Sequence, residues 1–262
     1  MKRITLFFII YILLSYQQGI CNDFACCNSG EILQYKMKLF NMPAGKMVFH
    51  VVQEFNTTAS PIIKVKVKAK TNTIFNPLFH IDNEYEAQFF KKTQLPLSLI
   101  KNIDQKNIKH SISIIYDQNK NQASISDSMK WVIPDSCYSF FSMFYHLRYN
   151  EYKKNDTLNF YIDAESIISR GMATITDSTM IHSSLGTLYA YKIDISFLPL
   201  NNSKRQWKTD LLTNRLASPH SYMTMWLSCD KYRLPLRVDF NQKQYKVSLE
   251  LLNYKQPELS VQ

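Results

Sequence analysis

Hydrophobic and polar residues alternate along most of the chain, which is the pattern of strands that bury one face. The alternation is clearest between residues 222 and 252, where three segments separated by short polar gaps turn apolar side chains the same way. It recurs upstream in short segments bounded by turn residues. The segments are 33–39, 47–51, 63–69, 84–90, 95–100, 108–117, 123–126, 158–163, 172–181, 188–197, 222–227, 234–240 and 245–251. This series predicts an all-β, mainly antiparallel protein, a curved, barrel-like meander of about 10–13 strands.

One segment, at about 135–148, has a helical pattern instead. Asp135 is a candidate N-cap, no Gly or Pro interrupts the segment, and Arg148 lies in its last turn. Its few small polar residues fall three to four positions apart, and the other side chains are bulky and apolar, so the helix must be buried. We therefore predict a sheet wrapped around one buried helix, and a second, short amphipathic helix at about 205–213.

The predicted helix would place aromatic side chains inside the sheet. The strand predicted at 222–227 would add a methionine to the same interior. The residues of this candidate ligand pocket are Phe140, Phe141, Phe144, Tyr145 and Met225. An apolar interior of this kind suits a lipid or another amphiphile. The alternative is that the helix completes a filled core without a cavity, because protein interiors normally pack densely.

The N-terminus resembles a secretory signal peptide. A basic start is followed by an apolar run over residues 4–14, which is too short to cross a bilayer, and then by polar and small residues. The expected organisation is a signal peptide at 1–21, a flexible segment at 22–29, one β-barrel-like domain at 30–254 and a tail at 255–262. We expect an exported protein of the periplasm or cell envelope. Lipoprotein anchoring through Cys21 or Cys26 is the less favoured alternative, because the flanking residues fit a lipobox poorly.

The chain is basic, with 31 Lys and Arg against 21 Asp and Glu and a formal net charge of +10. This surplus favours anionic partners, such as a membrane surface, or another envelope protein. Export and the lack of a nucleic-acid-binding motif argue against nucleic acid.

Two charged stripes stand out on the predicted strands. Lysines alternate with apolar residues at positions 64, 66, 68 and 70, and carboxylates occur at 82, 84 and 86. The lysines could form a basic stripe for an acidic surface, and the acids could form a binding site. The alternative, which we favour for both, is a solvated outer face.

Four cysteines follow the expected cleavage site: Cys26, Cys27, Cys137 and Cys229. In an oxidising compartment they could form one or two disulfides, whose pairing the sequence does not define. The alternative is that Cys137 and Cys229 are small buried hydrophobic residues and that the N-terminal pair is loose.

No catalytic or cofactor motif is present. The chain lacks the nucleophile elbow, the zinc-protease pattern and a Gly-rich phosphate loop, and no two histidines share a metal-ligand spacing. We therefore predict no catalytic residue, metal or cofactor, and a non-enzymatic binding protein. Two alternatives remain: a structural or interaction module with a filled core, and an envelope-polymer hydrolase whose carboxylate or Ser/His pair is assembled by the fold.

Several stretches together resemble the bacterial exported family called domain-of-unknown-function family 3108. They are G-E-I-L-Q-Y at 30–35, F-H-I-D-N-E-Y at 79–85, the helix segment with Asp135, Ser136, Tyr145 and Arg148, and a final motif with Trp226, Ser228, Asp230, Arg233, Pro235 and Arg237. The resemblance implies an exported, β-barrel-like protein, similar to the half-barrels that carry lipoprotein lipids, and implies no established reaction. Asp230, Arg233 and Arg237 could bind an anionic head group; the alternative, which we favour, is that Asp230 shapes a turn and Pro235 limits strand pairing.

Overall fold

The computed structural model describes residues 25–55, 60–75, 79–125, 129–200, 210, 221–242 and 245–256. Strands make up most of this part of the chain, with one α-helix, α2 (Phe140–Arg148), and one 3-10 turn, η1 (Thr73–Phe75). The strands are β1 (Ile32–Leu39), β2 (Met42–Phe55), β3 (Ile62–Thr71), β4 (Asp82–Phe90), β5 (Pro96–Gln105), β6 (Ile108–Asp117), β7 (Gln122–Ile125), β8 (Met129–Val132), β9 (Cys137–Ser139), β10 (Thr157–Asp163), β11 (Ile168–Ser183), β12 (Gly186–Pro199), β13 (Tyr222–Ser228), β14 (Pro235–Gln242) and β15 (Tyr245–Lys255). The predicted all-β fold with one buried helix is confirmed.

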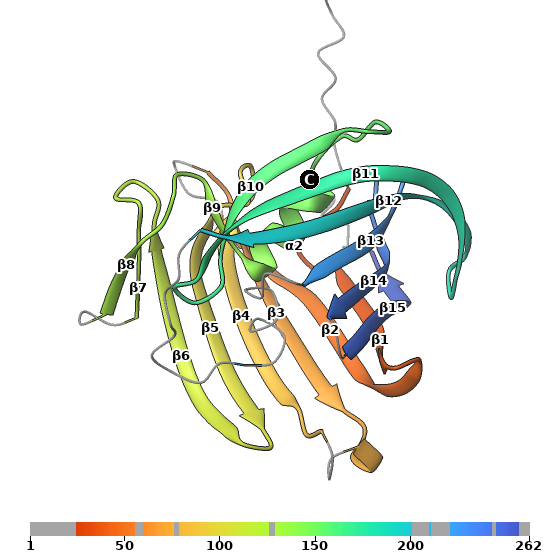
Figure 1. Cartoon of the computed structure of the whole chain (residues 1–262), viewed down its shortest axis with the longest axis horizontal. Helices are drawn as coiled ribbons and strands as arrows, with labels where there is room; N and C mark the ends of the chain where they lie inside the picture. The colour runs from red at the N-terminus through yellow and green to blue at the C-terminus, as the bar shows by residue number, and fades with distance from the viewer. Residues whose placement is uncertain are drawn as a thin grey trace, which may run out of the picture.

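All the described strands belong to one sheet, in the order β8-β7-β6-β5-β4-β3-β2-β1-β15-β14-β13-β12-β11-β10-β9. Neighbouring strands are antiparallel except β9 and β10, which are parallel. Because β1 pairs with both β2 and β15, two meanders, β1 to β8 and β9 to β15, join in the middle of the sheet (Figure 1). The first and last strands of the fold are therefore hydrogen-bonded neighbours.

The sheet curves strongly but does not close. Its two edge strands, β8 and β9, share no ladder within the described residues. Side chains bridge the seam beside β9 instead: Gln118 Nε2 donates to the Cys137 carbonyl at 3.0 Å, and the Tyr138 hydroxyl donates to the Thr93 carbonyl at 3.4 Å. The architecture is an open, barrel-like sheet.

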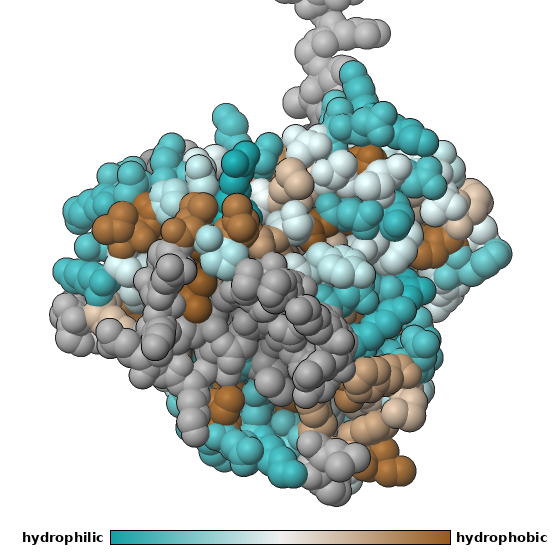
Figure 2. Space-filling model, in the orientation of Figure 1, coloured by the Kyte–Doolittle hydropathy of each residue, from teal (hydrophilic) through white to brown (hydrophobic). Residues whose placement is uncertain are grey.

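Alternation along each strand determines which side chains enter the interior. In β3, Ile63, Val65, Val67 and Ala69 are buried while the lysines between them face outward. On the face shown in Figure 2, hydrophilic residues prevail along both sides, and hydrophobic residues appear as small separate groups. The concave face is thus apolar and encloses α2, which lies inside the curve of the sheet (Figure 1).

The helix begins later than we predicted. Residues 137–139 form β9, and α2 starts at Phe140 with Ser139 as its N-cap. The Ser139 hydroxyl accepts from the Ser142 N–H at 3.3 Å, and the Ser139 N–H donates to Ser142 Oγ at 3.0 Å. Asp135 is exposed in the turn before β9 and does not cap the helix. Parallel pairing of Cys137 with Tyr161 of β10 takes these residues into the sheet, which the helical pattern did not reveal.

Two of the short strands, β8 and β9, were not predicted as strands. Each is at most four residues long, and the alternation of so short a segment is weak. The helix predicted at about 205–213 and the signal peptide lie outside the described residues, apart from Asp210. Within the described part of the chain, no helix has the length and apolar character needed to span a membrane.

Candidate functional site

The five residues of the predicted ligand pocket all lie inside the sheet, each at most 4% exposed: Phe140, Phe141, Phe144, Tyr145 and Met225. The sheet supplies rings that pack on the helix. Phe49 of β2 stacks on Phe144 with ring centroids 4.9 Å apart, and Tyr85 of β4 lies 4.8 Å from Phe141. The side of α2 that faces β2 and β4 is therefore aromatic core, and room for a ligand must come from other parts of the interior.

The end of α2 carries a buried ion pair between Arg148 and Glu31, whose side chains are both 0% exposed. The pair is bidentate: Nη1 donates to Oε2 at 2.8 Å, and Nη2 donates to Oε1 at 2.7 Å. Arg148 Nε also donates to the Arg233 carbonyl at 3.0 Å, and Nη2 to the Tyr232 carbonyl at 3.2 Å. Although burial alone would lower it, the carboxylate of Glu31 raises the pKa of Arg148 well above its usual range. One guanidinium thus ties α2 to the N-terminal segment and to the loop between β13 and β14.

Three of the sequence motifs meet at this guanidinium. Glu31 belongs to the motif at 30–35, Arg148 to the helix motif, and the Arg233 carbonyl to the motif that begins at Trp226. Residues far apart in the sequence form one contact, because β1 is central in the sheet and the β13–β14 loop lies near it. The geometry indicates that these motif residues hold the fold together.

The loop between β13 and β14 is built by the last motif. Asp230 Oδ1 accepts from the Ser228 hydroxyl at 2.8 Å and from the backbone N–H groups of Tyr232 and Arg233 at 3.0 and 3.2 Å. Ser228 Oγ in turn accepts from the Leu234 N–H at 2.7 Å. Asp230 therefore has the turn-forming role that we favoured over head-group binding.

The flanking motif residues have structural contacts as well. The Arg237 guanidinium lies 5.2 Å from the Trp226 ring centre and binds Asp239 through two hydrogen bonds of 2.8 Å. Pro235 starts β14 opposite Leu227, where the ladder shifts register. These contacts occupy Arg237 and position Pro235 at an irregular point of the sheet.

A second buried polar cluster lies on the concave face and was not predicted. Lys101 of β5 is 1% exposed, and its ammonium pairs with Glu165, in the turn between β10 and β11, and with Asp210 Oδ2 at 3.4 Å. Both carboxylates are at most 2% exposed. A buried ammonium is tolerated only with such partners. We call Lys101, Glu165, Asp210 and the nearby Asp163 the interior polar cluster.

The turn that carries Glu165 is strained. Glu165 and Ser166 have φ angles of 59° and 69°, in the left-handed region that non-glycine residues rarely adopt. The Ser166 N–H donates to Asp163 Oδ1 at 2.8 Å. Burial raises the pKa of Asp163 to about 6. The contacts with Ser166, Trp131 and Tyr116 act in the opposite direction and lower this pKa. Asp163 and Glu165 are a carboxyl pair of the kind a hydrolase would need, but both are buried and Glu165 is bound to Lys101, so the pair is not presented to a polymer.

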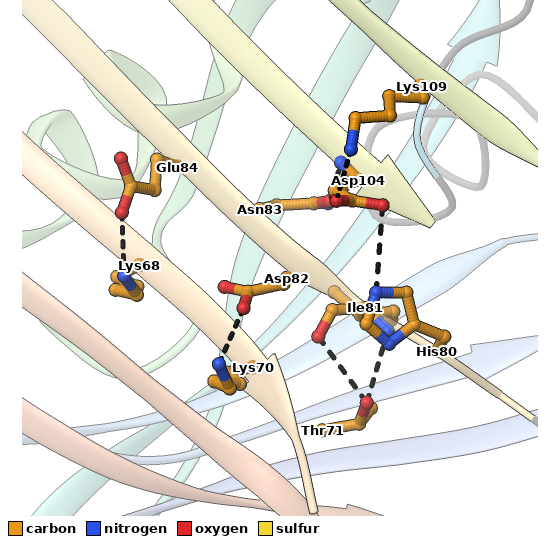
Figure 3. Close-up of polar contacts among 10 residues, drawn as sticks. All are labelled: Lys68, Lys70, Thr71, His80, Ile81, Asp82, Asn83, Glu84, Asp104 and Lys109. Atoms are coloured by element: carbon orange, nitrogen blue, oxygen red, sulfur yellow. Dashed lines mark hydrogen bonds and ion pairs between the residues drawn. The ribbon is translucent and has the colours of Figure 1, made fainter. Parts of the chain in front are cut away.

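The two charged stripes of the sequence lie side by side on the outer face and neutralise each other. Lys68 pairs with Glu84 and Lys70 with Asp82, each at 2.6 Å, across the β3–β4 ladder (Figure 3). A groove of about 530 Å³ runs over the same face and is lined by Lys66, Lys68, Glu84 and Glu86 among others. Opposite charges on adjacent strands stabilise pairing and keep the surface solvated. The stripes are thus a mixed-charge outer surface.

The four cysteines are free thiols in the structure, so none of the disulfides weighed from the sequence is formed. Cys26, Cys27 and Cys137 are buried and Cys229 is half-buried. Cys26 and Cys27 lie in the core beside Arg148, and the Ala25 N–H donates to the Lys231 carbonyl at 3.0 Å. The hydrogen bond of the Cys27 thiol lowers the pKa of Cys26, whereas burial raises the pKa of Cys27. The N-terminal segment is therefore held by packing and hydrogen bonds.

The family model of the protein family of unknown function DUF3108 matches residues 34–244 of the chain. The chain belongs to this family. The resemblance drawn from the motifs is confirmed, and DUF3108 membership defines no reaction or ligand. No match was found among the curated proteins.

Solved structures resemble the fold at very low sequence identity. A beta-barrel-like protein of the domain of unknown function DUF1849 from Brucella abortus is 7% identical, with a TM-score of 0.60 over 89% of this chain and 100% of that chain. A candidate exported protein with a YmcC-like fold from Bacteroides fragilis is 10% identical, with a TM-score of 0.42 over 88% of this chain and 97% of that chain. The first likeness supports the barrel-like fold; the second is too distant to support an argument.

Sequence patterns could have revealed part of the interior polar cluster. Lys101 follows directly after the strand predicted at 95–100 and lies between Leu99 and Ile103 at positions of the same parity, so extending that strand would have placed a lysine on its apolar face. Its partner Glu165 comes from a turn more than sixty positions away, and no local signal links the two. Only the fold brings the ammonium and its carboxylates together.

Proposed function

We propose that this protein is an exported, non-enzymatic binding protein that holds a lipid or another amphiphile against the concave face of its sheet. The observation that carries the proposal is the open seam. A curved sheet with an apolar inner face ends in two edge strands, β8 and β9, that do not pair with each other within the described residues.

An unpaired seam allows an apolar interior to admit a molecule without breaking a strand ladder. Near β9 the described contacts across the seam are side-chain hydrogen bonds, from Gln118 to the Cys137 carbonyl and from Tyr138 to the Thr93 carbonyl. Each such bond contributes only about 0.5–1.5 kcal/mol net. Bonds of this kind hold the edge at β9 more weakly than a strand ladder would, while the pair of Lys101 with Glu165 and the contacts of Asp163 with Trp131 and Tyr116 join the two sides of the sheet elsewhere in the interior.

The composition of residues 1–19 supports the proposed location. The basic residues, apolar run over 4–14 and polar stop are those of an export signal, which supports a place in the periplasm or cell envelope. Without Lys2 and Arg3 of the predicted signal peptide the formal charge of +10 becomes +8, and this surplus further supports contact with an anionic membrane surface or an envelope protein. Three of the four lysines of β3 contribute little to this attraction, because Lys64, Lys68 and Lys70 are paired with carboxylates of β4.

Native mass spectrometry of the mature protein purified from its own envelope tests the proposal. We expect a population whose mass exceeds that of the polypeptide by one lipid, and the same lipid in an organic extract. Delipidated protein incubated with the envelope lipids should regain this mass. A protein that shows only its own mass in both samples would refute the proposal.

The seam can be tested separately. Gln118→Ala removes the donor to the Cys137 carbonyl, and we expect faster release of bound lipid with little change in affinity, since the edge opens more often. Gln34→Ala, an exposed glutamine on β1, is the matched control and should leave the release rate unchanged. Equal release rates in the two variants would contradict entry at this edge.

The ring contacts favour a second candidate, a structural or interaction module of the envelope. Phe49 and Tyr85 already pack on the same face of α2, as expected for a filled core. A native mass equal to that of the polypeptide alone, together with co-purification of a defined envelope protein, would support this second function.

A further inference from the structure

Several polar side chains point to the concave face of the sheet without a hydrogen-bond partner among the described residues. Gln105 of β5 is 6% exposed, and neither its amide oxygen nor its amide nitrogen is paired. Ser169 of β11 is 0% exposed, and its hydroxyl is also unpaired. Buried polar groups are nearly always hydrogen-bonded, because an unpaired one loses its bonds to water without replacing them. The interior therefore offers unused hydrogen-bonding capacity.

These groups share the concave face with the interior polar cluster. Gln105 and Lys101 lie on the same strand at positions of the same parity. Asp163 ends β10, Glu165 lies in the turn that follows, and Ser169 comes directly after that turn in β11. The interior thus has an aromatic part around α2 and a polar part along β5, β10 and β11. Tyr85 joins the two parts, since its ring touches Phe141 and Asn83 donates to its hydroxyl at 2.7 Å.

The charges of the polar part favour one class of head group. Among the described strand residues, Lys101 is the one buried cationic side chain, and its ammonium is engaged by Glu165 and Asp210. Asp163 adds a third buried carboxyl. An anionic phosphate placed here would face carboxylates in a medium of low polarity, where repulsion between like charges is strong. A hydroxyl or an amine would instead find acceptors.

We propose that this polar lining is the head-group site of the bound amphiphile, and that it selects an uncharged or cationic head bearing O–H or N–H donors over an anionic one. The inference rests on the proposed amphiphile-binding function and adds the class of ligand. Gln105 and Ser169 supply the unpaired donors and acceptors of this lining, with Gln105 as the contact to be tested, while Asp163 and Glu165 would exclude anions.

Three probes with the same apolar chain test this selection: 1-dodecylglycerol, dodecylamine and dodecyl phosphate. Delipidated mature protein is titrated with each below its micelle concentration, and bound probe is measured by native mass spectrometry and calorimetry. We expect the neutral and cationic probes to bind at least about tenfold more tightly than the phosphate, a ratio that about 1.4 kcal/mol would produce.

Two substitutions separate the hydrogen-bonding and electrostatic parts. Gln105→Leu should lower the affinity for 1-dodecylglycerol about fivefold to tenfold, as expected for lost hydrogen bonds. Asp163→Asn keeps the size of the side chain and removes a carboxyl. It should therefore reduce the ratio of the affinity for dodecylamine to the affinity for dodecyl phosphate. Gln34→Leu, on the outer side of β1, is the matched control and should bind all three probes like the unmodified chain. Circular dichroism of each variant confirms that it is folded.

The possible results distinguish the inference from the function on which it rests. Binding of none of the probes, with no lipid in the native sample, overturns the proposed function. Equal binding of all three probes, or tighter binding of dodecyl phosphate, overturns the head-group selection and leaves amphiphile binding intact. Unchanged binding of 1-dodecylglycerol to folded Gln105→Leu overturns the assigned contact.

Discussion

Replacing Glu31 by Gln should destabilise the fold more than any single change on the outer surface. The substitution keeps the size of the side chain and removes its charge. Arg148 would remain fully buried, with a guanidinium that cannot lose its proton in a protein. The glutamine oxygen can accept one of the two hydrogen bonds that the carboxylate accepts now, and the amide NH₂ group would face the other guanidinium donor.

The magnitude follows from this geometry. Breaking a buried ion pair by removing one partner costs about 3–5 kcal/mol, because an uncompensated charge stays in the interior. Domains have a total stability of about 5–15 kcal/mol, so this loss is a large fraction of it. With a urea slope of about 3 kcal/mol per molar, the unfolding midpoint should fall by about 1–1.7 M. Equilibrium urea unfolding, followed by tryptophan fluorescence and circular dichroism, measures the shift.

Two further variants make the test specific. Glu250→Gln breaks the partly exposed pair with Lys38, whose Nζ–Oε1 distance is 2.7 Å, and should cost about 1 kcal/mol or less. The double variant Glu31→Gln with Arg148→Met removes the stranded charge and should recover much of the lost stability. If Glu31→Gln were no more costly than Glu250→Gln, the view that this guanidinium ties the three segments together would be wrong.

Three other outcomes are expected. Ser139→Ala should lower the free energy of unfolding by about 1 kcal/mol through loss of the N-cap, while Asp135→Ala should have almost no effect; equal losses in urea unfolding would contradict the observed helix start. A Cβ on Gly171 would meet the Phe160 ring at 2.2 Å, so Gly171→Ala should cost about 1–3 kcal/mol, and adding Phe160→Leu should restore part of it in thermal melts. Burial raises the pKa of Asp163 from 3.8 to about 6, so the folded state binds the extra proton and stability falls as pH rises from about 4 to 6. Asp163→Asn should therefore be more stable than the unmodified chain at pH 7, by up to about 3 kcal/mol, and similar below pH 4; no such difference between the two melting profiles would argue against a destabilising buried carboxylate.

The alternation of apolar and polar residues was enough to predict the all-β fold, most strand positions and the inward faces. In β3 it identified the side chains that are buried, from Ile63 to Ala69, because a strand has two faces and burying one of them requires period two. The buried helix was predicted for a similar reason, since a helix that is apolar nearly all round has to be covered. These are local properties, which a sequence expresses directly.

Other features depended on which strands become neighbours, and local patterns do not contain that information. The pairing of β1 with β15 helps to bring Glu31 to Arg148, whose guanidinium also donates to the Arg233 carbonyl. The curvature of the sheet brings Glu165 across the interior to Lys101. Parallel pairing with β10 takes residues 137–139 out of the helix. Strand order and curvature arise from the packing of the whole chain, so the polar interior and the open seam, on which the proposed function depends, were decided by tertiary structure.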